Sequence, residues 1–288
     1  MKKTIVLALA LSMALAVVGC AKTGEPAATA ASEAVSTTAE TAQEESTPAA
    51  AVEETTTAAE TETTTTDGAD AAAGVMTYEE YMAADLDSQV VIETYVQAKQ
   101  SWWEDKATVY SQDKDGAYFL YNMACSEEDY ERLVPGTKIR VTGYKAEWSG
   151  EIELMDATFE FVEGDEFIAD ALDVTDMLGT DGLIDHQNQF VTFKGMTVET
   201  AGQDADGKDV AYLYNWDGSG TEGDDLYFNV SLNGETYTFT VESYLCDKTT
   251  DVYKAVQSLE IGQTVDMEGF LYWYEGVNPH ITSLTVVK

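Results

Sequence analysis

The side chains with the clearest capacity for ligand chemistry in this sequence are its tryptophans. Flat aromatic faces stack on sugars or nucleobases without any help from positive charge. Ordinary packing is the alternative, because a large aromatic side chain also fills a core or a contact between domains. The five tryptophans and one adjoining tyrosine that we take as ligand-contact candidates are Trp102, Trp103, Trp148, Trp216, Trp273 and Tyr274.

Signals for catalysis are weak by comparison. His186 and His280 are the only histidines, and neither belongs to a recognisable nucleophile-activating or HExxH motif. The sequence also has no phosphate-binding loop, dinucleotide glycine motif or nucleophile elbow. We therefore predict a protein that is not an enzyme and that needs no cofactor.

Two acidic segments are weak candidates for a metal site. Asp113 with Asp115, and Asp204 with Asp206, resemble the opening of a calcium-binding loop. An EF-hand loop needs a glutamate at its twelfth position, and neither segment has one there. We expect the first segment to be a hairpin turn and the second a solvated loop.

The N-terminus carries the features of an export signal. Lys2 and Lys3 precede a short apolar stretch that ends in Val17-Val18-Gly19-Cys20. This segment resembles the bacterial lipobox, and the resemblance implies cleavage before Cys20 and a lipid on its thiol. An ordinary secretion signal with a chance cysteine is the alternative. The expected location is extracytoplasmic, with the protein lipid-anchored to the bacterial cell membrane.

A long acidic segment follows the signal. Residues 21–75 contain no Trp, Tyr, Phe, Leu, Ile or Met, so they cannot bury enough apolar surface to fold, and we expect a disordered tether. The whole chain of 288 residues has 53 acidic and 15 basic side chains, a formal net charge of −38. Because polyanion binding ordinarily needs clustered Lys and Arg, this charge disfavours nucleic acid as a partner.

The remainder of the chain repeats itself. The segment that starts at Gly136 recurs at Gly262, an offset of 126 residues. Each half predicts three strands, a polar helix and two more strands. The fourth strand of each half is the repeated segment itself, 136–144 and 262–270. The other strand and helix patterns of the first half are 90–99, 106–112, 117–123, 126–133 and 152–161, and those of the second are 190–199, 225–232, 235–244, 247–259 and 280–287.

That order resembles the OB-fold, a five-stranded Greek-key barrel with a helix between its third and fourth strands. The resemblance implies an all-β protein of two OB-like barrels, with another small barrel or one β-sandwich as the alternative. Cys125 and Cys246 take equivalent positions in the two repeats, so we expect two buried, unpaired thiols. The predicted organisation is 1–19 signal peptide, 20–75 tether, 76–164 first barrel, 165–189 bridge and 190–288 second barrel.

In the predicted strand order of the two barrels, every tryptophan falls in the connection between strands one and two or between strands four and five. OB-folds commonly hold oligonucleotides or oligosaccharides with these two loops. The leading hypothesis is a non-catalytic envelope lipoprotein whose tandem modules bind a glycan or another ligand that is not a polyanion. The alternatives are a structural or partner-binding envelope protein, and an OB-type nucleic-acid-binding or nuclease-accessory protein.

Overall fold

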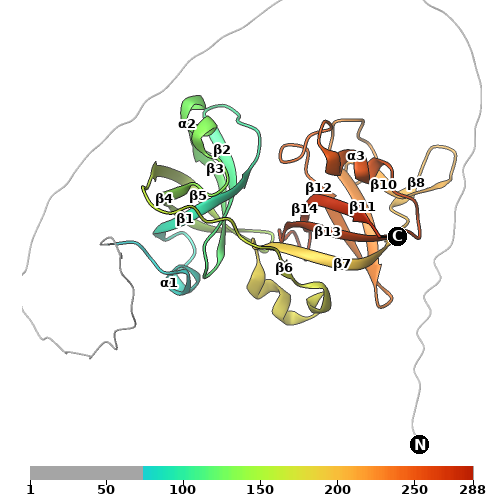
Figure 1. The fold of residues 1–288 in the computed structure, drawn as a ribbon, viewed down its shortest axis with the longest axis horizontal. Coiled ribbons are helices and arrows are strands. Elements are labelled where there is room, and N and C mark those ends of the chain that lie inside the picture. The colour runs from blue at the N-terminus through green and yellow to red at the C-terminus, as the bar shows by residue number, and fades with distance from the viewer. Residues whose placement is uncertain (1–73, 288) are drawn as a thin grey trace, which may run out of the picture. The chain divides into compact units, whose positions relative to one another are not determined.

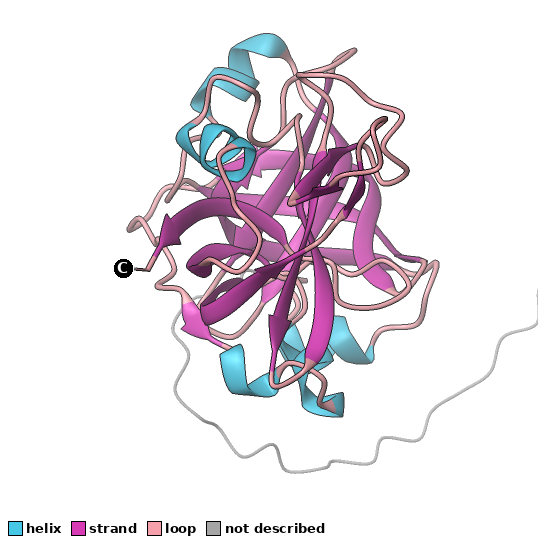
Figure 2. Ribbon diagram, turned by 90° about the vertical axis from the view of Figure 1, so that its right-hand side faces the viewer, coloured by secondary structure: helices cyan, strands magenta, loops and turns pink. Residues whose placement is uncertain are grey.

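The structure is a computed structural model and describes residues 74–287. The predicted signal peptide, the lipidation site at Cys20 and nearly all of the tether lie outside these residues. Strands dominate the described part, and the helices are short (Figures 1 and 2). No helix within residues 74–287 is long and apolar enough to cross a membrane.

The first barrel, coloured cyan to green in Figure 1, is a closed sheet of five strands in the order β1-β2-β3-β5-β4. Buried and partly buried positions alternate along β1, as expected for a strand with one face in a core, whereas β2 has five consecutive buried residues. A short helix, α2 (Glu127–Arg132), separates β3 from β4, and Ser126 caps it by accepting a hydrogen bond from the Asp129 amide. The strands are β1 Gln89–Lys99, β2 Lys106–Gln112, β3 Ala117–Ala124, β4 Lys138–Trp148 and β5 Glu151–Phe161.

The second barrel repeats this topology. Its first strand, β7, pairs with both the second and the fourth, which closes the ring β7-β11-β12-β14-β13. The tight turn between β11 and β12 is Asn233-Gly234, and both of its residues have positive φ, as the sequence predicts. The elements are β7 Phe190–Glu199, β11 Leu226–Leu232, β12 Glu235–Val241, α3 Asp251–Gln257, β13 Thr264–Phe270 and β14 His280–Val286.

The prediction of an all-β protein with two five-stranded OB-like barrels is therefore confirmed. Between and beside the barrels lie smaller elements that the sequence pattern does not resolve. They are α1 Tyr78–Ala83, β6 Leu172–Asp173, the 3₁₀ helices Thr175–Met177 and Asp181–His186, β8 Gly202–Gln203, β9 Asp209–Val210 and β10 Tyr212–Tyr214.

The second helix begins later than the sequence pattern predicts. Its N-cap is Thr250, whose hydroxyl accepts a hydrogen bond from the Tyr253 amide. Asp247 instead accepts hydrogen bonds from the amide and hydroxyl of Thr249, which closes a turn ahead of the helix. Two capping-type residues three positions apart compete here, and the later one starts the helix.

Each barrel has its own apolar core, and a third, smaller cluster joins them. Tyr110 and Phe119 of the first barrel are buried against Phe270 of the second. The rings of Tyr110 and Phe270 stack, with their centroids 4.4 Å apart. The outer face of β2 and β3 is thus partly buried by the second barrel.

Candidate functional site

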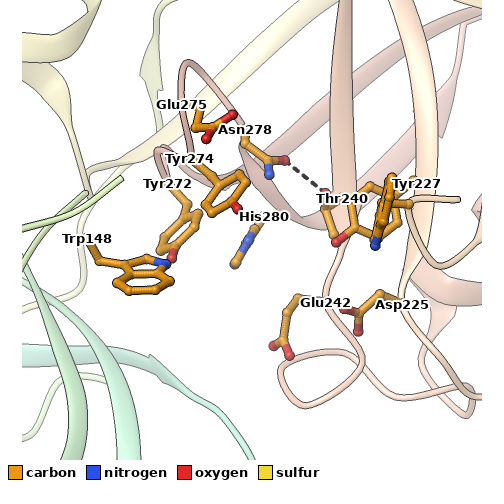
Figure 3. A pocket seen from close by; sticks show the side chains of 11 residues that line it. Trp148, Asp225, Tyr227, Thr240, Glu242, Tyr272, Tyr274, Glu275, Asn278 and His280 are labelled. Carbon is orange, nitrogen blue, oxygen red and sulfur yellow. Dashed lines mark hydrogen bonds between the residues drawn. The ribbon is translucent and has the colours of Figure 1, made fainter. Parts of the chain in front are cut away.

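A cleft of about 650 Å³ lies on the outside of the second barrel, and we call it the first cleft (Figure 3). It lies over β11 and β12, the second and third strands of that barrel, and residues from the β13–β14 loop close one side. The lining residues are Trp148, Trp216, Asp225, Tyr227, Thr240, Glu242, Tyr272, Tyr274, Glu275, Asn278 and His280.

Strand alternation places the polar side chains in this cleft. On β11, Leu226 and Phe228 are fully buried in the core, so Tyr227 between them faces outward. On β12, Val241 is buried in the same core and its neighbour Thr240 lines the cleft. The Thr240 hydroxyl donates to Asn278 Oδ1 at 2.8 Å, which ties the strand to the loop (Figure 3).

A histidine forms part of the wall of the first cleft and links the two barrels. The ring of His280 stacks on Tyr272 with centroids 4.3 Å apart. Its Nδ1 is hydrogen-bonded to the Tyr110 hydroxyl of the first barrel at 2.6 Å. Burial lowers the pKa of His280 to about 3, so the ring is neutral at physiological pH. These contacts give His280 a structural role where the two barrels meet.

Two carboxylates lie next to each other at the edge of the first cleft, Asp225 just before β11 and Glu242 just after β12 (Figure 3). Asp225 Oδ1 accepts hydrogen bonds from the amide and hydroxyl of Ser243. Glu242 is only 9% exposed, and its oxygens accept from the amides of Tyr244 and Leu245. Burial, with a further contribution from Asp225, raises the pKa of Glu242 to about 7.

A second cleft, of about 430 Å³, adjoins the first. It lies over β2 and β3, the second and third strands of the first barrel, and over the loop between β1 and β2. Glu242 lines both clefts, and the Ser101 amide donates to the Tyr244 carbonyl at 2.7 Å, which holds the two barrels together at this point. The lining residues are Gln100, Ser101, Trp103, Lys106, Thr108, Tyr121, Asn122, Glu242 and Tyr244.

Four of the six ligand-contact candidates lie in these clefts. Trp148, Trp216 and Tyr274 line the first cleft, and Trp103 lines the second. Trp216 and Trp103 are 76% and 67% exposed, so they fill no core. Sequence reasoning missed four further cleft tyrosines, whose outward positions on strands and loops were the available signal. They are Tyr121, Tyr227, Tyr244 and Tyr272.

The other two candidates have packing contacts. Trp102 is half-buried, and its Nε1 donates to the Cys125 carbonyl at 2.9 Å. Trp273 packs against the core of the second barrel. Neither lines the first or the second cleft, so the alternative of ordinary packing fits both of them. Cys125 and Cys246 are free, buried thiols.

The acidic segments form turns. Asp113 Oδ1 accepts from the amides of Asp115 and Gly116, and Asp204 Oδ1 accepts from those of Asp206 and Lys208. Their carboxylates are thus used in closing turns and loops. Within residues 74–287 no three His, Cys, Asp or Glu side chains converge to hold a metal ion.

Comparisons with known proteins identify no family for this chain. No family model matches it, and no curated protein matches it. Solved structures do match at low TM-scores. They include a murine DNA-binding protein bound to double-stranded DNA, with 8% identity, TM-score 0.31 and coverage of 69% of this chain and 95% of that chain. Another is p202 HIN1 in complex with a 12-mer of double-stranded DNA, with 9% identity, TM-score 0.31 and coverage of 68% and 92%.

A further match is a deletion mutant of the single-stranded DNA-binding protein from Thermus aquaticus, with 11% identity, TM-score 0.22 and coverage of 69% of this chain and 94% of that chain. Because these scores are low, the OB-like assignment rests on the strand order of the chain itself. The comparisons nevertheless contradict the expectation that nucleic acid is disfavoured as a partner, because these matches are DNA-binding proteins. That expectation, which rested on the net charge and on the lack of clustered Lys and Arg in the sequence, is withdrawn.

Proposed function

We propose that this protein is a non-catalytic OB-type binding protein that holds an extended, single-stranded nucleic acid across both barrels. One observation carries the proposal: the two clefts each lie on the second and third strands of a barrel, and they meet at Glu242. OB-folds bind oligonucleotides on this face, with help from the loops that here supply Trp103, Trp216 and Tyr274.

Stacking supplies the binding energy in this proposal. Bases stack on exposed aromatic faces whatever their sequence, and each stacked base contributes about 1–3 kcal/mol. Lys106 is the one Lys or Arg among the residues that line the two described clefts, so few phosphates are neutralised. The affinity should therefore depend weakly on salt. A plot of the logarithm of the association constant against the logarithm of the salt concentration should have a slope no steeper than about −0.7, the value for a single phosphate contact on a single strand.

The test is fluorescence anisotropy of the full chain with labelled oligo(dT) of about 20 nucleotides, enough to cover two OB sites. Trp216→Ala and Trp103→Ala should each weaken binding by roughly 5- to 150-fold, the equivalent of about 1–3 kcal/mol. Tyr144→Ala is the matched control, because Tyr144 is an exposed aromatic residue outside both clefts. No binding, or binding that these two tryptophans do not affect, would overturn the proposal.

A neutral oligosaccharide is the second candidate ligand. The observation that favours it is the charge of the first cleft, whose lining includes three carboxylates, Asp225, Glu242 and Glu275, and no Lys or Arg. Sugars stack on the same aromatic faces and carry no phosphates for these carboxylates to repel. Titration of the same variants with an N-acetylglucosamine oligomer separates the two candidates.

A further inference from the structure

The carboxylates of the first cleft retain capacity for a ligand. The hydrogen bonds from Ser243 go to Asp225 Oδ1, and within residues 74–287 no donor is found for Asp225 Oδ2. A carboxylate has about four acceptor sites, so Asp225 still has room for a donor from a ligand. Since Asp225 also contributes to the raised pKa of Glu242, the two negative charges interact directly.

The described residues that line the first cleft include no positive side chain to balance this charge. None of the residues that line the first cleft is Lys or Arg, and its one histidine, His280, is neutral. Residues 76–288 carry 42 acidic and 12 basic side chains, so the surrounding field also attracts cations.

Aromatic rings line the same cleft as the carboxylates. Figure 3 shows Trp148, Tyr272 and Tyr274 on one side of the cleft and Tyr227 on the other, with Asp225 and Glu242 beside the opening between them. The faces of such rings attract organic cations, and substituted ammonium groups are a recognised class of ligand for aromatic cages. The cleft volume of about 650 Å³ lies within the usual range for small-molecule sites.

We propose that the first cleft binds a substituted ammonium group, with the cation between the Asp225–Glu242 pair and the aromatic walls. The inference does not rest on the nucleic-acid proposal, because it concerns a small cation and only one of the two clefts. A cation seated there occupies the same aromatic faces as a polymer, so the two ligands are expected to compete.

Two probes of the same shape test this inference. Choline carries the quaternary ammonium charge, and 3,3-dimethylbutan-1-ol replaces its nitrogen by carbon. Tryptophan fluorescence or calorimetry of the full chain at about pH 8, where Glu242 is mostly ionised, should show choline binding roughly tenfold or more tightly than the alcohol.

Asp225→Asn removes one charge and keeps the Oδ1 acceptor that Ser243 uses, so the fold should survive and choline affinity should fall roughly fivefold or more. Glu268→Gln removes the same charge from an exposed position outside the cleft and should leave affinity within about twofold. Equal binding of choline and the alcohol, no choline binding, or an unchanged Asp225→Asn affinity would each overturn the inference.

Discussion

Glu151 is a fully buried acid where the β13–β14 loop of the second barrel meets the first barrel. Its Oε2 accepts a hydrogen bond from the Trp273 amide at 2.9 Å, and its Oε1 is buried with no partner among the described residues. Burial raises its pKa well above the ordinary value of 4.5. The folded protein therefore keeps this proton at pH values where the unfolded chain has lost it.

This difference makes stability depend on pH. Because the folded state binds the proton more tightly, the free energy of unfolding falls as pH rises above about 4.5. Glu151→Gln cannot ionise, so its stability relative to the native chain should rise with pH by up to about 1.4 kcal/mol per unit. Urea unfolding at several pH values between about 5 and 8 measures this difference, with Glu127→Gln on an exposed helix as the control. A difference that stays constant with pH would refute the prediction.

At the level of single residues, the sequence predicts only part of the candidate site formed by the two clefts. Of the predicted residues, Trp103, Trp216 and Tyr274 lie in loops and Trp148 lies at the end of a strand, and all four line a cleft. The sequence pattern cannot predict Glu242 as a site residue, because the packing of one barrel on the other buries this side chain and places it between the two clefts. Trp102 has the same residue type and loop as Trp103, and only the contact with the Cys125 carbonyl distinguishes the two.

Helix α1 shows how one side chain can secure a whole element. Lys145, on β4, is 5% exposed, and its Nζ donates to the carbonyls of Tyr81, Met82 and Ala84 at the end of the helix. Tyr81 itself is buried in the first barrel core. Six residues cannot form a stable helix alone, so α1 depends on these contacts.

Lys145→Met should detach α1, because it removes the side-chain donor shared by three carbonyls, of which only that of Tyr81 keeps a donor, the Ala84 amide. It also replaces a buried charge by an apolar chain. The expected loss is about 2–5 kcal/mol of unfolding free energy, together with early protease cleavage near residue 84. Gly116→Ala is a second route to the same result, because a Cβ there would lie 2.3 Å from the Tyr78 ring. If both variants keep the stability and protease resistance of the native chain, the account of α1 is wrong.

The elements differ in how far local sequence specifies them. Strands β1 and β11 follow from alternation, since each has one face in a core. Strands β2 and β7 occupy the predicted residues, although β2 is buried on both faces. Helix α1 has a capping box at Thr77 and Glu80, but its length gives no helical periodicity. Its stability comes from Lys145, more than sixty residues away, which no local pattern can indicate.

In the whole molecule, the outer face of β2 and β3 in the first barrel packs against the part of the second barrel where β13 ends and β14 begins. Tyr110, Phe119 and Phe270 bury one part of this contact, and the His280–Tyr110 hydrogen bond adds a polar link within it. As a result, only the rim of the first barrel face stays open as the second cleft, whereas the second barrel keeps a larger cleft. The repeat in the sequence predicts two equivalent sites, and docking makes them unequal.

The location of the molecule remains a proposal that rests on residues 1–20. Lipid attachment at Cys20 should place the barrels outside the cytoplasmic membrane. Cells that express the native chain should incorporate labelled palmitate into it, and Cys20→Ser should abolish the label and release the protein from the membrane fraction. A labelled Cys20→Ser protein, or an unlabelled native chain that is still membrane-bound, would contradict the proposal.

The position of Glu242 between the two clefts has a thermodynamic consequence. With a pKa of about 7, this carboxyl is a mixture of protonated and ionised forms near neutrality. A neutral or anionic ligand over either cleft favours the protonated form of Glu242, so binding takes up a proton from the buffer. A cation in the first cleft favours the ionised form, so its binding releases a proton. Ligand binding and proton uptake are therefore reciprocal, and occupancy of one cleft alters affinity in the other without any movement of the backbone.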